Sequence, residues 1–186
     1  MVRGLQLVMH VTSVRKASGK GFTLIEVLVT ILIVAIGLLG FASLQVTTLN
    51  QQFEALQRAQ VTAMIEDMAA RIRMNPSEAI SGAYYGAASG TTCASLTGAD
   101  RDLCEWNEMM LGSAAVKGDL NLAAPIGVQG CIEAGAPKSG ETVLRVSMAW
   151  QGITQSAAPS ESLGCGADSF GDDAYRRVLF RDVVVR

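Results

Sequence analysis

Residues 21–44 read GFTLIEVLVTILIVAIGLLGFASL. From Leu24 to Leu44 this stretch is apolar except for Glu26 and two mildly polar residues. As a helix it would be about 31 Å long, which is enough to cross a bilayer core of about 30 Å. We therefore expect a membrane-spanning helix that divides the chain into a short leading segment and a long following one.

The leading segment is basic. Residues 1–21 contain no acidic residue and four basic ones, Arg3, Arg15, Lys16 and Lys20. A basic flank stays in the cytoplasm, so the chain after the helix is expected on the opposite side of the membrane. A cleavable secretory signal fits less well, because its apolar run spans about 7–15 residues and ends in a small-residue cleavage site. Here the run is longer, and the small residue, Gly21, precedes it.

Glu26 stands out within the apolar stretch. A carboxylate at the bilayer centre costs about 2.5–3.5 kcal/mol, and less near the edge. Two interpretations are open: an interfacial glutamate that reaches the lipid headgroups, or a functional acid with a specific partner.

Composition excludes several kinds of function. The chain has 186 residues, a net charge of −2 and one histidine, His10, which precedes the apolar helix. This charge gives no footprint for nucleic acid, and the lack of later histidines argues against histidine-based catalysis or metal binding. Asp168, Asp172 and Asp173 do not follow the EF-hand spacing and are interpreted as an acidic surface turn. We predict no catalytic residue, no metal site and no cofactor.

The helix is expected to continue from Gln45 to about Met74, where Asn75-Pro76 ends it, because the residue before proline resists helical geometry. Arg71 and Arg73 are interpreted as solvated. Apolar residues recur at mostly three- and four-residue spacing and predict a face that packs on a globular head. They are Val46, Leu49, Phe53, Leu56, Val61, Met64, Met68 and Ile72.

The remaining sequence predicts a small antiparallel sheet. We expect an irregular loop over 83–92, a short helix over 100–112 and strands over 126–132, 142–151 and 175–185, with a turn at Gly140-Glu141. Three or four strands would pack on the C-terminal half of the long helix, which makes an α+β fold. The predicted divisions are a leader (1–21), a membrane-spanning or filament-core helix (22–44), an amphipathic continuation (45–75) and a head (76–186).

The four cysteines predict disulfides. They are even in number, contain no CxxC pair and lie on the side opposite the basic flank, in the periplasm. Three pairings are possible. We favour Cys93–Cys104, which closes a short loop, and Cys131–Cys165, which ties a strand to the glycine-rich insertion 156–173. Four unpaired thiols or a cysteine-only zinc site are the less favoured alternatives.

The sequence GFTLIEV, residues 21–27, follows the basic leader and opens the apolar helix, and it closely resembles the type IV prepilin (class III signal) motif. The resemblance implies that a prepilin peptidase cuts between Gly21 and Phe22 on the cytoplasmic side and N-methylates Phe22. The new amine has an ordinary pKa of about 7.7–8.0. As a cation it is a natural partner for Glu26 of an adjacent subunit. Met1 and Met9 both remain possible starts of the leader.

Four further stretches resemble the PilV family of minor pilins, also called type IV pilus modification proteins. They are IGLLGFASLQ (36–45), EDMAARIRMNP (66–76), RVSMAWQG (145–152) and YRRV (175–178). The apolar helix also lacks the proline that major pilins commonly have there. The resemblance implies a pilin-like fold and a non-enzymatic subunit that waits in the inner membrane, with its head in the periplasm.

The same resemblance implies the partners and the final place of the subunit. It would join other minor pilins and a large tip adhesin through the pilus assembly machinery, at or near the pilus tip, and support adhesion and twitching motility. Two alternatives remain: a minor pseudopilin of a type II secretion system, and a signal-anchored periplasmic enzyme or binding protein.

Overall fold

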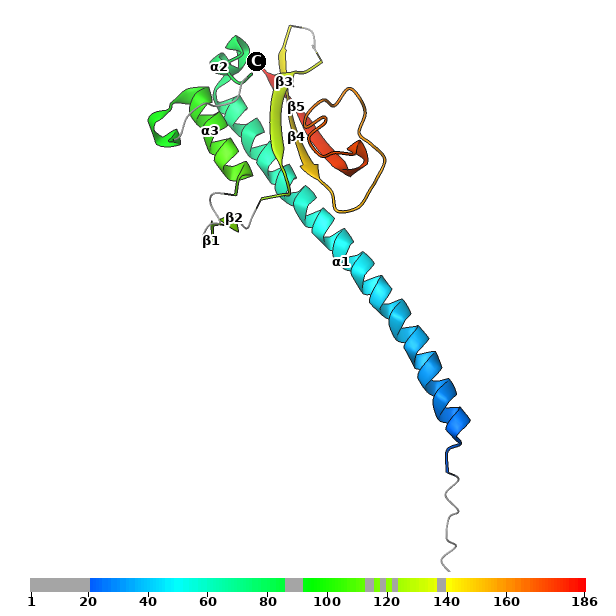
Figure 1. Cartoon of the computed structure of the whole chain (residues 1–186). Coiled ribbons are helices and arrows are strands. Elements are labelled where there is room, and N and C mark those ends of the chain that lie inside the picture. The colour runs from blue at the N-terminus through cyan, green and yellow to red at the C-terminus, as the bar shows by residue number, and fades with distance from the viewer. Residues whose placement is uncertain (1–20, 86–91, 113–115, 118–119, 122–123, 137–139) are drawn as a thin grey trace, which may run out of the picture. The chain divides into compact units, whose positions relative to one another are not determined.

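A computed structural model describes residues 21–85, 92–112, 116–117, 120–121, 124–136 and 140–186 (Figure 1). Its backbone contacts divide the chain into two compact units, one ending at Gln45 and one beginning at Val46. The helices are α1 (Leu24–Met74), α2 (Pro76–Ser81) and α3 (Gly98–Met110), with short 3₁₀ turns at Cys93–Ser95 and Asp173–Tyr175. The strands are β1 (Val116–Lys117), β2 (Leu120–Asn121), β3 (Gln129–Ala134), β4 (Thr142–Gln151) and β5 (Arg176–Val185).

Strands β3, β4 and β5 form an antiparallel sheet in that order, and β1 pairs with β2 in a separate two-stranded ribbon. The register of the larger sheet aligns Cys131 with Ser147 and Ser147 with Phe180. With the long apolar helix packed on this small sheet, the expected pilin-like α+β fold is confirmed.

Helix α1 begins with a side-chain cap. The Thr23 hydroxyl accepts a hydrogen bond from the Glu26 backbone N–H at 3.3 Å, so the helix starts at Leu24 rather than at Phe22. It ends at Met74, and Pro76 starts α2, where its missing N–H costs nothing.

The C-terminal part of α1 supplies one side of the core. Val61, Met68 and Ile72 are fully buried, and they belong to the same apolar cluster as Leu144 and Val146 of β4. Such side chains each contribute about 1.5–3 kcal/mol when taken out of water. Burial of this face holds the helix on the sheet.

The first half of the predicted packing face is not buried in the chain by itself, which corrects the expectation. Val46, Leu49, Phe53 and Leu56 are exposed, whereas the polar Gln57 is only 2% exposed. The apolar pattern takes a five-residue step from Leu56 to Val61, which rotates the stripe by about 140° around the helix. Gln57 lies four residues before Val61 and therefore falls on the buried face.

The predicted strand over 126–132 was misplaced. Ile126 and Gly127 form a turn in which Gly127 has a φ of 60° and the Val128 N–H donates to the Pro125 carbonyl at 3.4 Å. Because Gly127 adopts this left-handed conformation, β3 starts only at Gln129. The predicted helix over 100–112 and the two later strands are present as α3, β4 and β5.

The predicted loop over 83–92 falls largely outside the described residues, because 86–91 are not described. Its start is ordered by a buried side chain. Tyr84 is completely buried, and its hydroxyl donates to the Asp102 carboxylate at 2.6 Å. The sequence pattern of small residues around Tyr84 gave no sign of this anchor.

Arg71 is not solvated, which corrects a second expectation. Its guanidinium contacts Asp67 and Glu105 at 2.7 Å and Asp102 at 3.2 Å, and its side chain is 19% exposed. Burial alone would lower the pKa of Arg71, but hydrogen bonds from its guanidinium to the three carboxylates outweigh burial and raise it. These contacts tie α1 to α3. Arg73 is exposed, as expected.

We predict that Arg71→Ala lowers the free energy of unfolding by about 1.5–3 kcal/mol, because it leaves three partly buried carboxylates without their shared cation. The control, Arg73→Ala, removes an exposed arginine of the same helix and should change stability by less than about 0.5 kcal/mol. Chemical denaturation of the detergent-solubilised chain measures both. Equal effects of the two variants would contradict the structural role of Arg71.

The free energy of unfolding that Arg71→Ala removes should also depend on pH. Hydrogen bonds from Arg71 and Arg101 hold the pKa of Glu105 below its ordinary value of 4.5. A depressed carboxyl pKa stabilises the fold above pH 4.5, and this contribution is lost as the pH falls through the folded-state pKa. The difference between wild type and Arg71→Ala should therefore narrow in acid.

Candidate processing and assembly site

The bond between Gly21 and Phe22 lies in an open segment before α1. Phe22 is 82% exposed, and no heavy atom lies within 4 Å of where a Cβ on Gly21 would stand, apart from chain neighbours. A side chain at Gly21 would thus disturb nothing in the described chain. Any requirement for glycine here comes from a molecule that handles this bond.

Glu26 occupies the first turn of α1. Together with Thr23 it forms the T-x-x-E pattern of a capping box, in which the Glu26 N–H donates to the Thr23 hydroxyl at 3.3 Å and also to the Thr23 carbonyl at 3.1 Å. This local role was missed in the sequence, where the pattern Thr23-Leu24-Ile25-Glu26 could have shown it. Among the described residues, none pairs with the Glu26 carboxylate, so its charge is available to another chain.

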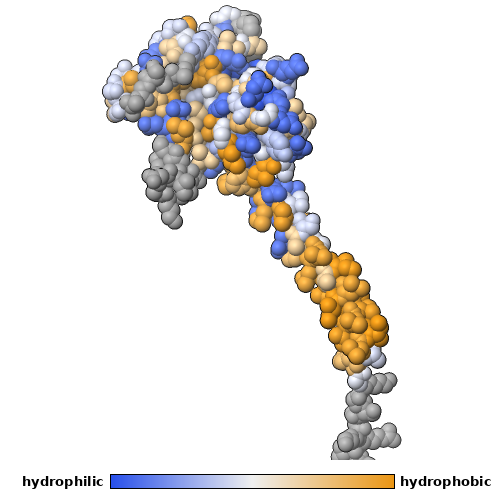
Figure 2. All heavy atoms as spheres, viewed as in Figure 1, coloured by the Kyte–Doolittle hydropathy of each residue, from blue (hydrophilic) through white to orange (hydrophobic). Residues whose placement is uncertain are grey.

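The helix after Glu26 presents apolar side chains on all sides. Figure 2 shows this segment of α1 as a continuous hydrophobic surface. Within the described residues, α1 is the one helix long and apolar enough to cross a membrane, and its most apolar window is not buried within the chain. Gly37 and Gly40 lie in this part, and the helix continues unbroken through both. A surface of this kind needs lipid or other apolar helices around it.

Residues 17–42 match a family model described as the prokaryotic N-terminal methylation motif. The chain carries a prepilin-type leader. It is thus a class III prepilin-like protein, and the leader implies processing by a prepilin peptidase and handling by a pilus or secretion machinery. The leader and the apolar helix together fit a pilin anchored in the inner membrane. Comparison with curated proteins found no significant match, and neither did comparison with solved structures.

In the head, the four cysteines form two disulfides, Cys93–Cys104 and Cys131–Cys165, the pairing favoured from the sequence. The first joins the turn at Cys93 to α3, and the second joins β3 to the segment after β4. Glu108 lies beside the first pair, but disulfide-bonded sulfurs are not thiolates and do not supply the ligands that zinc prefers.

The insertion held by Cys165 covers the face of the sheet that is turned away from α1. Arg176 is 3% exposed and donates to the carbonyls of Leu163 and Cys165, while Asp173 pairs with it at 2.6 Å. Asp172 accepts a hydrogen bond from the Ala174 N–H. Asp172 and Asp173 therefore bind within the chain and order the insertion.

We predict that Gly21→Val blocks removal of the leader and leaves the head intact. Valine meets no obstacle within the described chain, so the effect should arise at the peptidase. Mass spectrometry of the purified protein should find an N-methylated Phe22 terminus in wild type and an intact leader in the variant. Normal processing of the variant would contradict this assignment of the cleavage bond. Non-reducing peptide mapping checks that both disulfides still form.

Proposed function

We propose that this chain is a minor pilin, similar to the PilV family, that joins other minor pilins and a tip adhesin in a complex that primes type IV pilus assembly. The leader (1–21) is removed, residues 22–44 become the filament-core helix, residues 45–75 carry the helix into the head, and residues 76–186 form the head. The protein is a structural subunit rather than an enzyme. It supports adhesion and twitching motility from a place at or near the pilus tip.

The observation that carries the proposal is a prepilin-type leader joined to a pilin-like α+β head. The motif match covers the start of the chain only, so the minor-pilin assignment draws on the resemblances at 36–45 and 66–76 and on the absence of proline from the apolar helix. The exposed apolar surface of α1 supports a fate inside a helical bundle. Two disulfides suit a head that works outside the cytoplasm.

Glu26 would act in assembly as the partner of a neighbour's N-terminal ammonium. Cleavage between Gly21 and Phe22 frees an amine that is largely protonated near neutral pH, and N-methylation keeps its positive charge. In a bundle of apolar helices an unpaired carboxylate and an unpaired ammonium are each costly, and contact between them offsets both costs. The pair also sets the axial register between neighbouring helices.

We predict that Glu26→Ala leaves leader removal largely intact but reduces incorporation of the protein into surface pili at least tenfold. The matched control is Glu161→Ala, which removes an exposed glutamate from the head insertion. Sheared pili are quantified by immunoblot, and twitching zones are measured in a deletion strain complemented with each variant. Wild-type incorporation of Glu26→Ala would contradict the charge-pairing role.

The same strain separates the alternatives. Deletion should abolish or reduce surface pili if the protein primes pilus assembly. A strain with normal pili and defective export of a secreted enzyme would instead assign the chain to a type II secretion pseudopilus. If the leader stays attached in cells with active prepilin peptidase, the chain is instead a signal-anchored periplasmic enzyme or binding protein.

A further inference from the structure

Strand β5 forms an edge of the sheet. Its ten residues pair with β4 along one side, from Thr142 with Val185 to Gln151 with Arg176. No described strand pairs with the other side. An edge strand of this length offers a row of backbone donors and acceptors to any extended chain that can reach it.

A groove runs between this edge and α1. Its walls include four residues of α1 spaced four apart and three alternate residues of β5, with Trp150 of β4 and neighbouring residues of both elements also in the lining. The helix contributes Glu54, Arg58, Thr62 and Glu66, and the strand contributes Arg177, Leu179 and Arg181. The groove comprises two clefts, of about 320 and 230 Å³, which share Leu179.

Ion pairs cross the groove at both ends. Arg177 contacts Glu54 at 3.4 Å, and Arg181 pairs with Glu66. Glu54 also accepts hydrogen bonds from the Thr154 N–H and hydroxyl at 3.2 and 2.8 Å. Burial would raise the pKa of Glu54, but these hydrogen bonds and Arg177 outweigh it and lower the pKa. The charged side chains at both ends of the groove therefore have partners of opposite charge within the chain.

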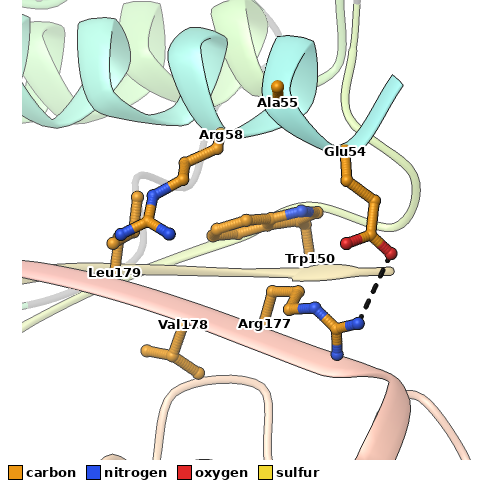
Figure 3. A pocket seen from close by; sticks show the side chains of 7 residues that line it. All are labelled: Glu54, Ala55, Arg58, Trp150, Arg177, Val178 and Leu179. Atoms are coloured by element: carbon orange, nitrogen blue, oxygen red, sulfur yellow. Dashed lines mark hydrogen bonds and ion pairs between the residues drawn. The ribbon is translucent and has the colours of Figure 1, made fainter. Parts of the chain in front are cut away.

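The centre of the groove holds a cation, Arg58, without such a partner in the described part of the chain. Figure 3 shows Arg58 reaching from α1 toward Leu179, beside the ring of Trp150, while Glu54 reaches toward Arg177. None of the described residues accepts a hydrogen bond from the Arg58 guanidinium or forms an ion pair with it. Arg58 is itself exposed, and the ring beside it belongs to Trp150, which is only 4% exposed. The fork of a guanidinium matches both oxygens of a carboxylate, and carboxylates are the acidic groups that an unmodified polypeptide offers.

We propose that an extended segment of another polypeptide adds to the free edge of β5 and places an aspartate or glutamate on Arg58. In a sheet, alternate side chains of each strand point to the same face. A strand added beside β5 would therefore direct every second side chain into the groove. The aspartate or glutamate stands at the position opposite Leu179, and the two ion pairs limit how far the added segment can slide along the groove.

Charge disfavours a second copy of this chain as the occupant. Strand β5 reads RRVLFRDVVV, with three arginines and one aspartate. These arginines already pair within the chain, with Asp173, Glu54 and Glu66, and the aspartate of the strand, Asp182, pairs with Arg145. A second β5 strand would therefore bring no free carboxylate to Arg58. The partner is therefore a different, acidic segment.

The test uses the full chain in cells that assemble it. A photo-crosslinking amino acid at Thr62, which is exposed and lines the groove beside Leu179, is activated in intact cells. Mass spectrometry then identifies the captured peptide. We expect a segment of another protein that contains an aspartate or glutamate next to the crosslinked position. Capture of a second copy of this chain, or no capture in cells that make normal fibres, would overturn the proposal.

Charge reversal tests the role of Arg58 itself. Arg58→Glu should lower the crosslink yield at least tenfold, whereas Arg58→Lys should keep most of it. The matched control is Arg73→Glu, the same change at another exposed arginine of the same helix that does not line the groove, and it should have no effect. Replacing the captured acid with lysine in the partner should restore the yield with Arg58→Glu. If that exchange does not restore the yield while both disulfides form, the contact with Arg58 is wrong.

Failure here is distinguishable from failure of the proposed function. Glu26→Ala acts through the apolar helix and should reduce incorporation whether or not the groove is occupied. Arg58→Glu leaves the leader and Glu26 unchanged, so leader removal should be normal in that variant. A minor pilin without a strand partner would show the Glu26→Ala defect and no crosslink at Thr62 that depends on Arg58.

Discussion

Burial of one face of α1 on the sheet is the constraint on which the rest of the head depends. Val61, Met68 and Ile72 lose all contact with water there, together with Leu144 and Val146 of β4. The apolar face of the sheet and the apolar face of the helix would each be exposed to water without the other. Each element stabilises the other, and the disulfides and ion pairs add to this contact.

The same helix serves two environments because its apolar pattern changes along its length. Up to Leu44 the apolar residues surround the helix, which suits lipid or a bundle of other helices. From Val61 they lie on one side, which suits a sheet. Between these parts, Val46, Leu49, Phe53 and Leu56 stay exposed in the single chain. A surface of this kind needs other apolar groups to cover it.

The charged groups of the head divide by location. Arg71 with its three carboxylates joins α1 to α3, and Arg176 orders the insertion after β4. Arg177 and Arg181 cross from β5 to α1. Arg58 stands among them without a described partner, on the side of the sheet where an edge strand is free. Partner recognition by this head is thus best sought at that edge rather than at the core.

The sequence alone determined the leader, the apolar helix, α3 and the two long strands, because each depends on a pattern within a few neighbouring residues: a glycine before a long apolar run, or strict alternation over ten residues. It also pointed to the cysteine pairing, although three pairings were open.

Tertiary structure decided what depends on distant residues. The sequence around Arg71 does not distinguish it from an exposed arginine, because its partners Asp102 and Glu105 lie on α3. Tyr84 lies in a stretch without periodicity, and its hydroxyl binds Asp102 only in the folded chain. The groove beside β5 had no local signal at all, because its walls lie more than a hundred residues apart in the chain and meet only when the helix packs on the sheet.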